Sequence, residues 1–163
     1  MVRVFVIATT PMQIAGLRAM LISSEIEIVG VSLIPDIALE ELPESNVIVI
    51  ADEVLLEDAV RTMTSDETVS IVVMANNERK AFSLLRSLKV RSWGIIPETA
   101  SASYLQGATI SVAQGSVVFP SVLMRNFHEE HLHVQSVLLE APDETLTTRE
   151  REVLELVSQG LSN

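Results

Sequence analysis

Three histidines lie close together in the sequence and are interleaved with two glutamates: His128, Glu129, Glu130, His131 and His133. Imidazole and carboxylate groups are common metal ligands. On a helix, His128 and His131 would share a face, but His133 would point elsewhere, and two histidines four residues apart around a glutamate do not occur here. We therefore interpret this run as a solvated connector and expect no metal site; a pH-sensing role is the alternative.

A second cluster is basic and lies within an otherwise acidic chain. It is either a solvated helix face or one half of an electrostatic interface with a partner. The basic residues are Arg79, Lys80, Arg86, Lys89 and Arg91, and the complementary acidic residues would be Glu40, Glu41, Glu44, Glu57 and Asp58. Charge alone leaves both interpretations open.

Other patterns that carry catalysis or cofactor binding do not occur in the sequence. The chain has no cysteine, which excludes a thiolate nucleophile and cysteine-built metal centres. No glycine-rich phosphate loop follows the first apolar run, and no serine lies in a nucleophile-elbow context. We therefore expect that the protein is not an enzyme and binds no cofactor.

Five short apolar runs recur along the chain, each too short to span a membrane. They are continuously apolar rather than alternating, which is typical of parallel strands covered on both faces. Stretches with helical features lie between them. The predicted strands are Val2–Ile7, Ile26–Leu33, Val47–Ala51, Val69–Met74 and Trp93–Ile96, and the later predicted helices are Pro35–Glu41, Glu53–Met63, Asn77–Leu88 and Ser101–Ala113.

The first helix has the clearest start, because Thr10 suits the N-cap and Pro11 the first helical position. Strand alternating with helix through five repetitions predicts an α/β fold, a flavodoxin-like doubly wound sheet of five parallel strands in the order 2-1-3-4-5. A site in such a sheet lies at the carboxyl ends of the first and third strands. There the chain has Ala8-Thr9-Thr10 and Ala51-Asp52-Glu53.

Size and charge restrict the function further. The chain has 163 residues, 48% of them hydrophobic, which suits one compact domain with a short appendage. Its formal net charge of -11 is opposite to the basic footprint of a self-sufficient nucleic-acid-binding domain. We expect a cytoplasmic protein with no membrane partner, and these residues by themselves should bind DNA poorly.

The C-terminal part differs in composition. Residues 118–145 contain Pro120 and loop-like segments, so we expect a linker that is partly helical. In residues 146–163, Thr147 and Glu150 form a capping-box pattern before an apolar stripe, which predicts one further helix.

Two stretches resemble response regulators of the NarL/FixJ type, which join a receiver domain to a LuxR-type helix-turn-helix. Residues 146–163 are similar to the opening of that DNA-binding domain: Thr147, Arg149 and Glu150 match its motif, and Thr148 stands where the family favours proline. Residues 2–30 resemble the first strand, helix and second strand of the receiver. The resemblance implies a CheY-like pseudo-receiver at residues 1–117, the linker at 118–145, and the start of an incomplete helix-turn-helix domain at 146–163.

The residues that receivers of this family use for phosphorylation are replaced here. The resemblance places Ala8 and Thr9 at the acidic pair that holds magnesium, and Ala51 at the phosphoryl acceptor, with Asp52 immediately after it. A shift of one residue would restore an acceptor, but a lone carboxylate is a poor magnesium site, so Asp52 is interpreted as a capping or solvated side chain. Ala75 aligns with the switch serine or threonine, and Glu98 aligns with the family's lysine. Together these replacements predict a degenerate, phosphorylation-incompetent pocket.

These features predict the regulatory domain of a DNA-binding transcriptional regulator. It would act through homodimerisation, a regulatory protein or a small ligand, and would contact DNA through a C-terminal domain beyond Asn163. The alternative is a stand-alone protein–protein interaction module that never touches DNA. A flavodoxin-like enzyme or cofactor binder is the third hypothesis, and it rests on fold alone.

Overall fold

The computed structural model describes residues 1–33, 47–62, 68–121 and 123. Several features named above lie outside the described residues: the predicted helix Pro35–Glu41, the acidic residues 40, 41 and 44, the three histidines, and residues 146–163. The chain divides into two compact units, Met1–Met124 and Arg125–Asn163, and the fold that follows is that of the first unit. Its elements are β1 (Val2–Ile7), α1 (Pro11–Leu21), β2 (Ile26–Ser32), β3 (Val47–Ile50), α2 (Glu53–Thr62), β4 (Ser70–Ala75), α3 (Glu78–Ser87), β5 (Ser92–Pro97) and α4 (Ala102–Ala113).

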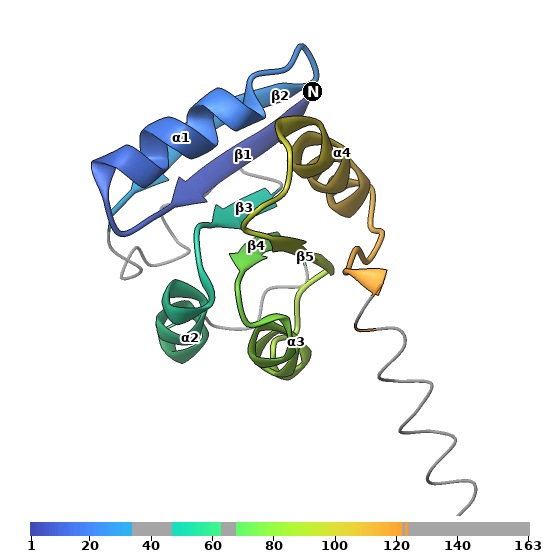
Figure 1. Cartoon of the computed structure of the whole chain (residues 1–163). Helices are drawn as coiled ribbons and strands as arrows, with labels where there is room; N and C mark the ends of the chain where they lie inside the picture. Colours follow the sequence, from blue (N-terminus) through green and yellow to red (C-terminus); the bar gives the residue numbers. More distant parts are fainter. Residues whose placement is uncertain (34–46, 63–67, 122, 124–163) are drawn as a thin grey trace, which may run out of the picture. The chain divides into compact units, whose positions relative to one another are not determined.

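The five strands form one parallel sheet in the order β2-β1-β3-β4-β5, which confirms the predicted fold. α1 and α4 pack on one face of this sheet and contact each other, while α2 and α3 pack together on the opposite face (Figure 1). Each hydrophobic face of the sheet is therefore covered by a pair of helices.

The helices begin where their capping residues predict. The Thr10 hydroxyl accepts a hydrogen bond from the backbone N–H of Gln13, and the Gln13 side-chain oxygen accepts one from the backbone N–H of Thr10. The side chains of Asn77 and Ser101 cap α3 and α4 by accepting hydrogen bonds from the backbone N–H groups of Lys80 and Tyr104. Within the described residues, no helix is both long and apolar enough to cross a membrane.

The centre of the sheet forms the core. β3 and β4 are buried along their whole length, as expected of parallel strands that are covered on both faces. The two buried serines of β4 and β5 satisfy each other: the hydroxyls of Ser70 and Ser92 are 2.7 Å apart, and Ser92 donates to the carbonyl of Val112 at 2.6 Å. These bonds tie both strands to α4 without leaving a buried polar group unpaired.

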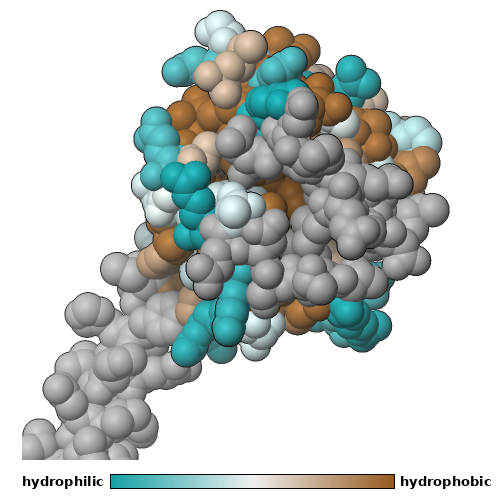
Figure 2. Space-filling view, turned by 180° about the vertical axis from the view of Figure 1, so that it is seen from behind, coloured by the Kyte–Doolittle hydropathy of each residue, from teal (hydrophilic) through white to brown (hydrophobic). Residues whose placement is uncertain are grey.

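β2 differs from the expectation of burial on both faces. It lies at the edge of the sheet and pairs only with β1, and its residues alternate between buried or half-buried and exposed. Val29 and Val31 are 36% and 40% exposed, and Leu33 follows at 45%. Figure 2 shows hydrophobic residues at the surface in the upper part of the molecule, seen from behind. A continuously apolar run therefore does not distinguish an edge strand from a central one.

The chain continues to pack on the sheet after α4. Val118 forms a parallel bridge to Gly94 of β5, with hydrogen bonds from Ile95 N to Val118 O (2.8 Å) and from Val118 N to Trp93 O (3.1 Å). Leu123 is buried. The residues that follow α4 thus cover the edge of β5 and belong to the first compact unit.

Candidate functional site at the carboxyl edge of the sheet

The residues predicted for the site come together at one edge of the sheet. Ala8 follows β1, Ala51 follows β3, Ala75 ends β4 and Glu98 follows β5. The register of the parallel strands brings these four strand ends to the same edge. Ala8 and Ala75 are buried, with 0% and 2% exposure, so they contribute methyl groups and no polar side-chain atom.

Asp52 lies between the end of β3 and the start of α2, and its carboxylate caps this helix. Its Oδ1 accepts hydrogen bonds from the backbone N–H groups of Val54 (3.0 Å) and Leu55 (2.8 Å). The first N–H groups of a helix have no partner inside the helix, and aspartate is among the residues that satisfy them best. The carboxylate is thus engaged by the protein itself.

Substitution of Asp52 separates its capping role from its charge. Asp52→Ala is expected to lower the free energy of unfolding by about 1 kcal/mol, because the cap is lost. Asp52→Asn should stay within about 0.5 kcal/mol of the native chain, because asparagine caps as well as aspartate. Urea denaturation followed by circular dichroism measures both. Equal losses in the two variants would show that the charge, not the cap, stabilises α2.

Two glutamates hold the loop between β4 and α3. Glu53 accepts hydrogen bonds from the backbone N–H groups of Asn76 (3.2 Å) and Asn77 (3.3 Å). Glu98 accepts one from the side-chain amide of Asn76, with 2.6 Å between Nδ2 and Oε2. Hydrogen bonds to a charged acceptor are stronger than those between neutral groups. Asn76 therefore links the loops that follow β3, β4 and β5.

The sequence placed Glu53 and Glu98 at this edge but did not show that Asn76 bonds to both of them. A glutamate in the first turn of a helix and an asparagine just before a helix both suggest local capping, and neither pattern indicates a bond across loops. The strand order, which places α2 beside the loop after β4, supplies the missing information.

Thr9 makes only local contacts at the start of α1. Its hydroxyl donates to Oε1 of Gln13 at 2.6 Å, and its backbone N–H donates to the same oxygen at 3.1 Å.

The carboxyl edge of the sheet contains three carboxylates, of Asp52, Glu53 and Glu98, and each accepts hydrogen bonds from protein N–H groups. In the part of the chain that is described, no three histidine, cysteine, aspartate or glutamate side chains are grouped so that they could hold a metal ion. The hydrogen bonds of these three carboxylates hold the start of α2 and the loops that follow β4 and β5 in place.

Comparison with known proteins adds to this geometry. No protein-family model matches the chain. The chain is 29% identical over 92 residues to a protein of Hyphomicrobium methylovorum described as "Probable transcriptional regulatory protein SgaR". This match covers 56% of the chain and 38% of the relative, so the chain spans well under half of the relative's length.

Two solved structures show the same architecture. The isolated REC domain of RcsB from Salmonella enterica serovar Typhimurium superposes with a TM-score of 0.61 at 20% identity, over 78% of this chain and 99% of that one. A LuxR family DNA-binding response regulator from Silicibacter pomeroyi superposes with a TM-score of 0.57 at 19% identity, over 75% of this chain and 98% of that one. Both likenesses agree with the strand order. The chain has the CheY-like receiver fold.

Within this receiver fold, part of the basic cluster on α3 is used inside the chain. Nζ of Lys80 lies 2.6 Å from Oε2 of Glu57 on α2, and Arg61 bonds the same glutamate at 2.9 Å. The hydrogen bond that Lys80 donates to Glu57, together with the charge of Lys80, lowers the pKa of Glu57, and the same hydrogen bond raises the pKa of Lys80. Lys80 and Glu57, which the interface interpretation of the sequence places on opposite sides, therefore pair within one molecule.

The other four basic residues of the cluster differ in their contacts. The guanidinium of Arg86 lies 5.5 Å from the ring centre of Phe82, a cation–π contact. Arg79, Lys89 and Arg91 are exposed or at the rim of α3, and none makes an ion pair with another residue that the structure describes. Two of the five basic residues, Lys80 and Arg86, are thus engaged by side chains of the same chain.

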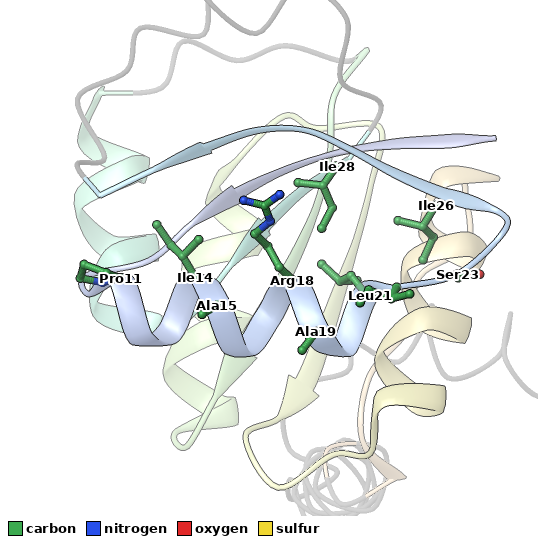
Figure 3. A pocket seen from close by; sticks show the side chains of 10 residues that line it. Pro11, Ile14, Ala15, Arg18, Ala19, Leu21, Ser23, Ile26 and Ile28 are labelled. Carbon is green, nitrogen blue, oxygen red and sulfur yellow. The ribbon is translucent and has the colours of Figure 1, made fainter.

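A groove of about 750 Å³ lies between α1 and β2, away from the carboxyl edge. Its walls are mostly apolar, and Arg18 is the one charged residue among those that line it. Figure 3 shows the Arg18 side chain extending from α1 over β2 toward Ile28. The groove is open to solvent, and the predicted site residues do not contribute to it.

Proposed function

We propose that this chain is the receiver-like regulatory domain of a DNA-binding transcriptional regulator and that it acts without phosphorylation of an aspartate. The receiver fold, the relative described as a probable transcriptional regulatory protein, and the DNA-binding response regulator of similar structure support the regulatory role. The resemblance of residues 146–163 to the start of a LuxR-type helix-turn-helix supports the DNA-binding part. The recognition helix of such a domain would follow Asn163, so the coding sequence downstream tests this part: a stop codon there favours the stand-alone interaction module.

The residues at the carboxyl edge of the sheet support the proposal that the domain acts without phosphorylation. Ala8 and Thr9 supply no carboxylate for magnesium, which needs oxygen ligands that offset its charge. Asp52 is engaged as the cap of α2. Glu98, bound to Asn76, places negative charge where an incoming phosphoryl group would need positive charge. The hydrogen bonds of Glu53 and Glu98 hold the loop after β4 with no phosphoryl group required.

Without phosphorylation, another input must set the state of the domain. Dimerisation, a regulatory protein or a small ligand can each shift an equilibrium between two conformations if it binds one of them more tightly. The role is regulatory and not catalytic. We propose that the protein is cytoplasmic, because transcriptional regulators of this type bind DNA in the cytoplasm.

The proposal is tested by incubation of the chain with acetyl phosphate and magnesium, followed by intact-mass measurement. We expect no gain of a phosphoryl group on the native chain. A variant with Ala8→Asp, Thr9→Asp, Ala51→Asp and Glu98→Lys serves as the positive control, because it restores the acidic pair, the acceptor and the cation. A stable acyl phosphate on Asp52 of the native chain, lost in Asp52→Asn, would contradict the proposal.

A further inference from the structure

The groove between α1 and β2 forms at the edge of the sheet. β2 pairs only with β1, so no other described strand continues the sheet beyond it. On β2, Ile26 and Ile28 line the groove, and they share one face of the strand because they are two positions apart. On α1 and its C-cap the lining residues recur three or four positions apart, as on one side of a helix: Pro11, Ile14, Ala15, Arg18, Ala19 and Ile22. Regular secondary structure therefore forms most of the walls.

α1 has apolar residues on two sides. Leu17 and Leu21 are buried in the core. Among the residues that line the groove, Ala15 and Ala19 are exposed, and Ile22 is 76% exposed. A surface helix normally places charged residues on the side that faces water, yet α1 has one charged residue among 11. The groove thus presents an apolar surface to solvent that the core does not use.

The single charged residue of α1, Arg18, has no acidic partner in the fold. Its side chain takes part in none of the ion pairs or side-chain hydrogen bonds among the residues that the structure describes. The one carboxylate of β2 belongs to Glu27, which points to the face of the strand opposite to Ile26 and Ile28. It lies 3.7 Å from Arg3 of β1. The charge of Arg18 is therefore not balanced by the adjacent strand.

The end of α1 does not require Arg18 either. An arginine in the last turn of a helix stabilises the carbonyl groups that are exposed there. Here the carbonyl oxygens of Met20 and Ile22 accept hydrogen bonds from the side-chain amide of Gln106, at 2.7 and 3.0 Å. The Arg18 side chain instead extends over the groove toward Ile28 (Figure 3). The guanidinium is thus held beside an apolar surface.

We infer that the groove between α1 and β2 binds a small aliphatic carboxylate, whose carboxylate group pairs with Arg18 and whose chain lies along the apolar walls. The planar guanidinium matches a carboxylate group with two parallel hydrogen bonds. The apolar residues that line the groove are all aliphatic, so they favour a saturated chain over an aromatic ring. The volume of about 750 Å³ lies within the range of small-molecule sites.

Charge makes this site selective for one end of the ligand. At a net charge of -11 the chain repels anions over most of its surface, so a carboxylate binds where a local cation attracts it. Seven residues separate Arg18 from Pro11, about 10 Å along α1, which accommodates a chain of medium length. Because the groove is open, the dissociation constant should be about 0.1–1 mM. As a regulatory input this ligand rests on the proposed function, whereas its binding rests on the groove.

The test is a titration of the full 163-residue chain, labelled with nitrogen-15, with octanoate up to about 5 mM, followed by the amide resonances in NMR spectra. Saturable shifts are expected at Ala15, Ala19 and Ile28. 1-Octanol has the same chain without the charge and should bind at least about tenfold more weakly. Butanoate keeps the charge but has four fewer methylene groups, and it should also bind at least about tenfold more weakly.

Two matched variants separate Arg18 from the general charge of the chain. Arg18→Gln should weaken octanoate binding at least about tenfold and leave the binding of 1-octanol unchanged. Arg18 is exposed, so the melting temperature of this variant should stay close to that of the native chain. Arg79→Gln removes the same charge from an exposed position on α3 and should leave octanoate binding unchanged.

Three outcomes would overturn the inference: no saturable shift at the groove, equal binding of octanoate and 1-octanol, or the same loss of octanoate binding in Arg79→Gln as in Arg18→Gln. Each of them would leave phosphorylation independence standing. Phosphorylation of Asp52 would overturn the proposed function without changing the binding of octanoate at the groove.

Discussion

Replacement of Trp93 by alanine is expected to lower the free energy of unfolding by about 3 kcal/mol. Trp93 lies in β5 between two aromatic rings: Phe82 of α3 at 5.6 Å with an edge-to-face angle of 70°, and Phe119 at 6.2 Å with an angle of 34°. Aromatic pairs in such geometries contribute about 0.5–1.5 kcal/mol each beyond the area they bury. The indole therefore holds both α3 and the segment around Val118 against the sheet.

The measurement is urea denaturation followed by far-UV circular dichroism, because the variant has no tryptophan left. Trp93→Phe is the control, and it should cost less than about 1.5 kcal/mol since it keeps an aromatic ring in the same place. In Phe119→Ala, Trp93 remains as the sole tryptophan of the chain and its emission should shift to the red as the ring becomes more exposed. An unchanged unfolding midpoint in Trp93→Ala would show that this aromatic cluster does not stabilise the fold.

The sheet and the helix starts were predictable because their signals are local. Val47–Ile50 and Ser70–Ala75 are buried on both faces, as their continuously apolar sequence indicates. Thr10 and Ser101 cap the helices that follow them, since capping depends on residues three positions apart. The strand order followed from the repeated alternation of strand and helix.

The contacts that shape the candidate site were not predictable, because they join residues far apart in the chain. The hydrogen bonds that Glu53 accepts from Asn76 and Asn77 span 23 and 24 residues, and the bond from Asn76 to Glu98 spans 22. The sequence shows the sign of each charge but not its partner. For the same reason the charge of Lys80 left a solvated face and an interface both open, and its pairing with Glu57 of the same chain could not be predicted.

Two features of the sheet edges were also missed. The exposure of Val29 and Val31 depends on β2 being an edge strand, and an apolar run does not show which elements will cover it. The bridge between Val118 and Gly94 extends the sheet beyond its fifth strand by a single residue pair, which is too short to leave a strand pattern. The sequence therefore predicted the sheet and its covering helices, but not what happens at the two edges of the sheet.

Substitution of Gly30, in the edge strand β2, is expected to cause the second large loss of stability. In the pairing of β1 with β2, the register shifts between Val4 and Phe5, and Phe5 faces Gly30. A Cβ atom added at Gly30 would overlap the ring of Phe5. Gly30→Ala should therefore lower the free energy of unfolding by about 2 kcal/mol, because the ring must move or the irregular pairing must open. The φ angle of Gly30 is not positive, so the cost comes from the ring and not from the backbone conformation.

A double-mutant cycle with Phe5→Leu isolates this contact. If the ring causes the loss, Gly30→Ala should cost less in the Phe5→Leu background, with a coupling of about 1 kcal/mol or more. Gly16→Ala is the matched control: the chemical change is the same, but the added methyl meets open space on a helix, so the variant should be more stable by about 0.5–1 kcal/mol. Thermal and urea unfolding at low protein concentration measure all four variants. Additive losses in the cycle would mean that Gly30 is required for a reason other than its contact with Phe5.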